Sequence, residues 1–230
     1  MKFPILFLLV LSVSFALAQS SSYYYIPPGT VTVKFCPLAL ADDISFPTIQ
    51  MGIEYRVSKQ ISWYNEFGIK YRKSYYEKTD TSFISSKGFK AKTELRYYIK
   101  KRNRKAFGFY GGVNAFFTRD YHNNEILYFH DKDTAIITDA FAVRKDVFGF
   151  NFIFGFQRNI SKKIGVDVYG GVGIRFRDVT AYEKEYNKKT DDLLDGPDIH
   201  IKDFRDRIDA NNGFSTTGNL TFGVRFCYKL

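Results

Sequence analysis

The sequence predicts an all-β fold: an eight-stranded antiparallel up-and-down β-barrel that crosses a membrane. The first supporting observation is strict alternation, clearest in 147–159, where every second residue from Phe148 to Phe156 is phenylalanine. Side chains two residues apart point the same way on a strand but scatter around a helix. The second observation is that connections between such stretches alternate in length. The third is that aromatic residues gather near both ends of the stretches.

The chain opens with the features of a secretory signal peptide. Lys2 supplies a basic start, 5–17 is almost entirely apolar, and Ala16-Leu17-Ala18 is a small-x-small cleavage site. The apolar stretch is short for a transmembrane helix. We therefore predict a signal peptide over 1–18, an N-terminal extension over 19–29 and a single barrel domain over 30–230.

Eight alternating stretches are predicted to form the strands. They cover 30–38, 46–57, 61–73, 88–100, 106–118, 147–159, 163–177 and 217–230. Each has apolar side chains at one parity and polar, charged or glycine residues at the other. In the third stretch, for example, Ile61, Trp63 and Phe67 have one parity, and Ser62, Glu66 and Gly68 have the other. Such strands separate two different environments.

The connections alternate between short and long. Three are short, at 58–60, 101–105 and 160–162, and four are long, at 39–45, 74–87, 119–145 and 178–216. Short turns at one end and long loops at the other are typical of outer-membrane barrels, whose termini lie at the short-turn, periplasmic end. The stretch 119–145 is apolar for a loop, so part of it is expected to extend the strands as a hairpin.

Aromatic side chains of the apolar face fall at two heights in this topology. Near the short-turn end are Tyr55, Trp63, Tyr97, Phe107, Phe156 and Tyr228. Near the long-loop end are Tyr71, Phe89, Phe117, Phe148 and Phe176. Mostly aliphatic residues lie between them. Two aromatic girdles around an aliphatic band are typical of strands that together span a bilayer.

Alternation alone also fits a soluble, lipocalin-like barrel with an apolar ligand pocket. We favour the membrane because the apolar face persists for about ten residues per strand, the length that a tilted strand needs to cross. The net charge of +10 fits a solvated surface, or attraction to anionic lipid head groups and lipopolysaccharide phosphates. Export and the absence of a suitable motif argue against a nucleic-acid partner.

The charged residues on the polar face form the candidate site. They are Glu54, Arg56, Glu66, Lys70, Glu94, Arg96, Asp167, Arg175 and Arg225. Because an unpaired buried charge is costly, we expect acids and bases at similar depth to pair and to plug the narrow lumen. The surplus of basic groups near the lumen ends leaves a narrow, anion-preferring channel as the alternative.

Cys36 and Cys227 both face inward, on the first and last strands, which become neighbours when a barrel closes. Export makes a disulfide chemically accessible, but its strict geometry depends on the strand register. The sequence therefore does not decide between a Cys36–Cys227 disulfide and two free thiols.

Catalytic, metal and cofactor sites are not indicated. His122, His130 and His200 fall in the long connections, without the spacing of a zinc site. No histidine lies on a predicted strand to serve as the base for a nucleophile. The acidic stretch 191–198 lacks the alternation of a calcium loop. We expect no enzyme activity and no cofactor.

Three segments carry a resemblance to a known family: 109–113 (FYGGV), 167–173 (DVYGGVG) and the closing 220–230 (LTFGVRFCYKL). With the signal peptide, they resemble small outer-membrane β-barrel proteins of Gram-negative bacteria, of the OmpA and OmpX type. The resemblance implies an outer-membrane location, contact with lipopolysaccharide and a closing strand that the outer-membrane assembly machinery reads. Such strands usually end on an aromatic residue, whereas this one ends on Leu230, two residues after Tyr228.

Architecture is better specified than activity, because related barrels bind, adhere or structure the envelope. We expect a monomer that acts as a structural or interaction protein through extracellular loops, whose envelope or extracellular ligand the sequence does not name. The narrow anion-preferring channel is the alternative function, and the soluble ligand-binding barrel is the third.

Overall fold

The computed structural model describes residues 27–42, 45–72, 86–99, 108–130, 136–187, 189–193 and 213–230. The predicted signal peptide, most of the N-terminal extension, the turn at 101–105 and His200 lie outside these ranges. Within them the fold is all-β and antiparallel, as the alternation predicts. No helix in this part of the chain is long and apolar enough to cross a membrane.

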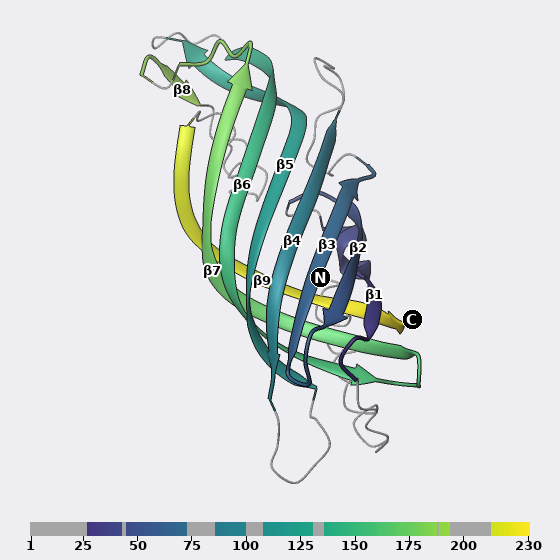
Figure 1. Cartoon of the computed structure of the whole chain (residues 1–230). Coiled ribbons are helices and arrows are strands. Elements are labelled where there is room, and N and C mark those ends of the chain that lie inside the picture. Colours follow the sequence, from purple (N-terminus) through teal and green to yellow (C-terminus); the bar gives the residue numbers. More distant parts are fainter. Residues whose placement is uncertain are drawn as a thin grey trace, which may run out of the picture.

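Nine strands and one short 3-10 helix, η2, make up the described fold (Figure 1). Their bounds are β1 Val31–Phe35, η2 Pro37–Ala41, β2 Thr48–Arg56, β3 Ile61–Lys70, β4 Lys87–Tyr98, β5 Phe109–His130, β6 Ile136–Asn159, β7 Ile164–Tyr182, β8 Asp191–Leu193 and β9 Gly213–Lys229. Every predicted stretch overlaps one of these strands, but β5, β6, β7 and β9 extend beyond their predicted bounds at the long-loop end. The additional strand, β8, is too short to leave an alternating signal in the sequence.

The strands form one curved sheet in which neighbours along the chain are neighbours in space. Pairing runs from β1 through β2, β3, β4, β5, β6 and β7 to β9, and β9 pairs back with β1. The pairing is uneven, because β9 pairs with β7 from Gly213 to Tyr228 but with β1 only from Phe226 to Lys229. β8 joins the edge of β5.

β1 is shorter than the predicted 30–38 because Pro37 follows it. Proline has no backbone N–H to donate to a strand ladder, and here it opens η2. Both β2 and β9 contact η2, which lies beside the end of β1. Phe46 is buried, with its ring beside the ammonium groups of Lys70 and Lys90.

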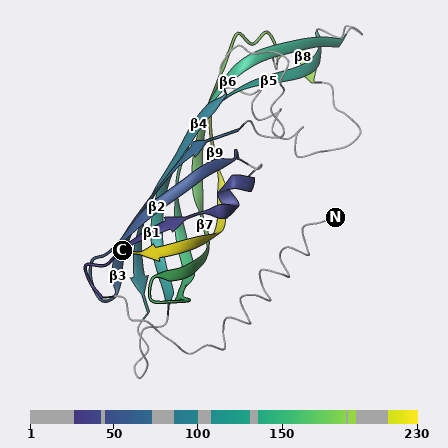
Figure 2. The ribbon, with the colours of Figure 1, turned by 90° about the vertical axis from the view of Figure 1, so that its right-hand side faces the viewer.

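Most of the predicted long connection at 119–145 is strand. β5 and β6 pair continuously from Phe109↔Phe156 to Phe129↔Ile136. In both views β5, β6 and β8 extend beyond β1–β3 at one end (Figures 1 and 2). A small apolar core holds this extension together and consists of Ile126, Tyr128, Phe141, Val143, Val179 and Tyr186. The expected hairpin is therefore confirmed, and its apolar residues pack against one another.

Burial in the rest of the sheet is the reverse of that in a soluble protein. Large apolar side chains of one parity are exposed, and Phe152 and Leu220 are 66% and 80% exposed. Charged side chains of the other parity are inside the curved sheet, and Arg96, Asp167 and Arg225 are 0% exposed. The apolar face thus points outward and the charged face points inward.

Aromatic rings on the outer face lie in rows across neighbouring strands. At the long-loop end, the rings of Phe148 and Phe176 are stacked with centroids 6.2 Å apart, and those of Phe176 and Phe214 with centroids 6.0 Å apart. At the short-turn end, the centroids of Phe109 and Phe156 are 4.7 Å apart. The register of the sheet therefore brings aromatic residues together at two heights.

Candidate functional site

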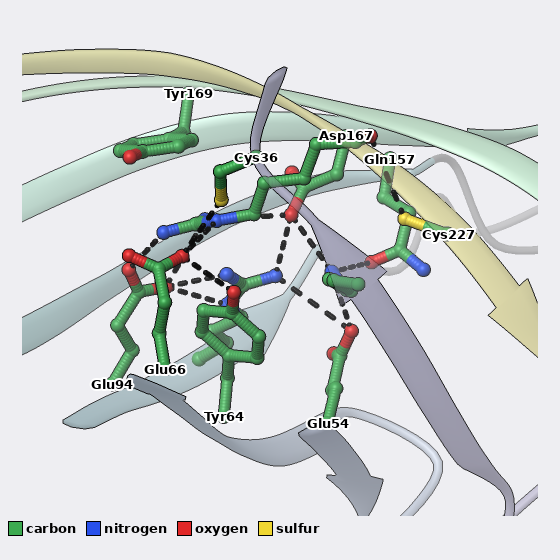
Figure 3. Close-up of polar contacts among 12 residues, drawn as sticks. Cys36, Glu54, Tyr64, Glu66, Glu94, Gln157, Asp167, Tyr169 and Cys227 are labelled. Carbon is green, nitrogen blue, oxygen red and sulfur yellow. Dashed lines mark hydrogen bonds and ion pairs between the residues drawn. The ribbon is translucent and has the colours of Figure 1, made fainter. Parts of the chain in front are cut away.

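The candidate site is a network of buried charges inside the curved sheet (Figure 3). Its carboxylates come from β2, β3, β4 and β7, and its cations from β1, β4 and β9. The members are Lys34, Glu54, Glu66, Lys92, Glu94, Arg96, Asp167 and Arg225. All have the inward parity of their strands, so the alternation that exposes the apolar face also gathers these side chains.

Asp167 is the best-connected carboxylate of the network. One of its oxygens, Oδ2, lies 2.7 Å from Lys34 Nζ, 2.9 Å from Arg96 Nη1 and 3.5 Å from Arg225 Nη1. Its other oxygen, Oδ1, accepts a hydrogen bond of 2.8 Å from the hydroxyl of Tyr110. Cations from three strands therefore converge on a single acid.

Arg225 joins the opposite side of the network. Its Nε donates to Glu66 Oε2 at 3.0 Å, and its Nη2 donates to Glu94 Oε1 at 2.6 Å. The guanidinium also lies over the ring of Tyr169, 3.6 Å from the centroid. Figure 3 shows Glu66 and Glu94 on the same guanidinium, and a shared cation between two acids offsets their repulsion.

Lys34 and Arg96 connect the two sides. Lys34 Nζ lies 2.7 Å from Glu54 Oε2 and donates to Gln157 Oε1 at 2.9 Å. Arg96 hydrogen-bonds Glu94 on its own strand and Asp167 across the interior. Because every carboxylate in this set has a cationic partner, the large cost of burying an isolated charge is avoided.

Glycines make space for the tyrosines of the interior. Tyr110 lies opposite Gly155 in the register, and a Cβ on Gly155 would approach the Tyr110 hydroxyl to 2.4 Å. Tyr169 lies opposite Gly223, where a Cβ would come within 2.7 Å of the ring. The rings fill the volume that these glycines leave. The guanidinium groups of Arg96 and Arg225 lie over the faces of Tyr110 and Tyr169, respectively.

Three of the residues predicted for the network have other partners. Arg56 lies over the ring of Tyr98, 3.7 Å from its centroid. Lys70 pairs with Asp120 at 2.7 Å, nearer the long-loop end. Arg175 donates to the hydroxyl of Thr217 at 2.9 Å and forms no ion pair within the described ranges. These side chains point inward as predicted, but they lie at different depths.

Sequence reasoning omitted several members of the network. Lys34 has the inward parity and was placed on the polar face but not in the network, and Lys92 has the same parity. The tyrosines at positions 64, 98, 110 and 169 and Gln157 were also left out, although they too alternate with apolar residues. Their roles follow from the register, which brings Tyr110 to Asp167 and Tyr98 to Glu54.

Both cysteines are free and buried, so the disulfide left open by the sequence is not formed. The register places Cys227 opposite Lys34 rather than opposite Cys36. The Cys36 thiol instead donates to Glu66 Oε2 at 3.0 Å. The offset along the two strands separates the thiols even though they share a face.

A second polar cluster lies at the long-loop end, on the part of β5 beyond the predicted span 106–118. Asp120 pairs with Lys70 and lies 3.2 Å from His122 Nδ1, with all three side chains buried. Burial alone would raise the pKa of Asp120, but the hydrogen bond and charge of His122, together with Lys70, lower it to about 2. No group of three or more residues with metal-ligand chemistry occurs in the part of the chain that the structure describes.

The fold and the site define an all-β antiparallel protein with an apolar exterior and a charged interior. Comparison with known proteins adds no family to this description: no family model, no curated protein and no solved structure matches the chain.

Proposed function

We propose that the chain is an outer-membrane protein whose curved sheet closes as an eight-stranded transmembrane β-barrel, resembling the OmpA and OmpX type. The observation that carries the proposal is the reversed burial. Exposing Phe152, Phe154 and Leu220 to water would be unfavourable, whereas exposing them to lipid is not. The charged interior also argues against a soluble barrel with an apolar pocket.

Strand lengths support the same reading. A tilted strand needs about 9–11 residues to cross a bilayer, and β2 and β3 have 9 and 10 residues. β5 and β6 are much longer, with 22 and 24 residues. Their excess length projects beyond the aromatic row at the long-loop end, so the hairpin lies outside the membrane on the extracellular side.

The buried network supports a structural role for the interior. Paired charges and tyrosine rings fill the space between Lys34, Glu66 and Asp167, which leaves the barrel plugged at this level. The protein then acts through its extracellular part, where β5, β6, β7 and β8 present an ordered hairpin held by its own apolar core. Such a platform suits an envelope or extracellular partner.

Cell fractionation followed by gel electrophoresis tests this function. The protein should appear in the outer-membrane fraction and should migrate differently before and after boiling, because a closed barrel resists detergent until it is heated. Recovery in the soluble periplasm, without a mobility shift, would overturn the proposal.

A narrow anion-preferring channel is the second candidate. One observation favours it, namely that Arg175 pairs with a neutral hydroxyl and no carboxylate among the described residues. Single-channel recording separates the two functions. The plugged barrel predicts no steady conductance, whereas the channel predicts anion current that Arg175→Ala reduces.

A further inference from the structure

At the short-turn end of the interior lies an arginine, Arg56, that has no hydrogen-bond partner among the described residues for two of its nitrogens. Arg56 is the last residue of β2 and is only 6% exposed. Its Nε and Nη1 are buried and donate to no group in the described ranges. Arg96 and Arg225 differ from it, because each binds at least two carboxylates. A buried guanidinium with unused N–H groups is unfavourable unless an acceptor is supplied.

Tyr98 holds Arg56 in place. The guanidinium lies 3.7 Å from the centroid of the Tyr98 ring. The hydroxyl of Tyr98 lies 2.7 Å from both Glu54 Oε1 and Gln157 Oε1. The ring is therefore anchored independently of Arg56. The cation–π contact stabilises the face of the guanidinium. It leaves the N–H groups on Nε and Nη1, which lie in the guanidinium plane, without acceptors among the described residues.

Gln157 provides another buried donor beside the same tyrosine. Its Oε1 accepts a hydrogen bond from Lys34 Nζ, and because an ammonium can only donate, this contact fixes which end of the amide is oxygen. Its Nε2 is buried and has no acceptor among the described residues. Two side chains in contact with Tyr98 therefore have buried donors that are not used.

The charges around this end favour an anion. The nearest acids are already paired, Glu54 with Lys34 at 2.7 Å and Asp167 with Lys34 and Arg96. The other charged side chains of the described short-turn end are all basic and are Lys59, Arg158, Lys162, Lys163 and Lys229. An excess of one sign beside buried donors raises the local concentration of the opposite ion.

We propose that Arg56 and Gln157 form a binding site for a phosphate-type oxyanion at the short-turn mouth of the interior. A phosphate carries negative charge and several acceptor oxygens, so a single group accepts hydrogen bonds from both side chains. In the orientation of the proposed barrel, this mouth faces the periplasm. Phosphate reaches it either as the free ion or as the head group of a phospholipid in the adjacent leaflet.

Calorimetry with inorganic phosphate tests the site in the full mature chain refolded in a non-ionic detergent. The wild type should bind phosphate, and Arg56→Gln should bind it about tenfold or more weakly, because glutamine cannot supply the charge-assisted hydrogen bonds of the guanidinium. Lys162→Gln is the matched control, since it removes one positive charge from an exposed turn at the same end. It should change the affinity by about twofold or less.

A second variant controls for loss of folding, and a second measurement identifies the source of the bound phosphate group. Arg56→Lys, which keeps the charge, replaces Arg56→Gln if the latter shows no boiled-versus-unboiled mobility shift, and it should also weaken binding. Native mass spectrometry with added phosphatidylglycerol identifies the source: loss of retained lipid in the Arg56 variant assigns the head group, and loss of phosphate binding alone assigns the free ion. Equal phosphate affinity and lipid retention in the wild type, the Arg56 variant and Lys162→Gln would overturn the site.

Discussion

Replacing Asp167 with asparagine should destabilise the folded chain strongly, although the side chain keeps its shape. Asp167 is 0% exposed and has three cations within 3.5 Å, namely Lys34, Arg96 and Arg225. An asparagine at this position would be neutral and would keep only one acceptor oxygen, so these cations would lose a shared counter-charge in the interior.

The magnitude follows from what the cations retain. Removing one partner from a buried pair costs about 3–5 kcal/mol. Lys34 keeps Glu54, Arg96 keeps Glu94, and Arg225 keeps both of its glutamates. We therefore expect Asp167→Asn to lower the free energy of unfolding by the smaller value, about 3 kcal/mol.

Urea titration of the protein refolded in lipid vesicles measures this change, with the boiled-versus-unboiled gel shift as the readout of folding. The matched control is Asp146→Asn, which removes the same charge from β6. Asp146 pairs with Arg119, whose side chain is 37% exposed, so its loss should cost about 1 kcal/mol or less. Equal effects of the two substitutions would refute the assignment of the interior charges to a water-excluded network.

Three further predictions concern other regions. The pKa of Asp120 is lowered to about 2 from about 3.9 in an unfolded chain. Its contribution of about 2–3 kcal/mol to the free energy of unfolding is therefore present above about pH 4 and is lost as the pH falls towards 2. Asp120→Asn should therefore flatten the acid side of a stability–pH profile, and an unchanged slope would contradict the pairing with Lys70 and His122. Cys36 and Cys227 should react with a maleimide reagent only after unfolding, and a reductant should not change gel mobility, whereas labelling of the folded protein or a reductant-dependent shift would contradict two buried free thiols. Phe152→Arg should lower the free energy of unfolding in vesicles by about 2–4 kcal/mol. Ile136→Arg, on the exposed end of the hairpin, should lower it little in the same titration. Equal effects of the two substitutions would place Phe152 in water.

The strands could be predicted because parity is a local property of the sequence. The run from Phe148 to Phe156 can place its rings on one side only as a strand, and β6 contains it. Local reasoning was wrong about the length of the first strand, since Pro37 ends the ladder before the alternation ends. It also could not define β8, whose three residues gain their conformation by pairing with β5.

The sequence predicts that charged side chains face the interior, but it does not predict which of them pair. Parity is sufficient to turn Glu66, Arg96 and Asp167 inward. Depth depends on the stagger between strands, which sets Asp167 opposite Arg225 and leaves Arg175 opposite Thr217. A sequence carries little information about that stagger, so it could not separate the paired arginines from Arg56, nor show that the two cysteines are offset.

The outward orientation of the apolar face is the central claim, and Trp63 reports on it directly. It is the single tryptophan of the chain and projects from the outer face of β3, with 52% of its surface exposed. The decisive measurement is Trp63 fluorescence in vesicles that contain brominated lipids. The membrane barrel predicts strong quenching by bromine on the acyl chains and weak quenching by aqueous acrylamide. Efficient quenching by acrylamide with no effect of the brominated lipids would show that this face meets water, and the transmembrane account would be wrong.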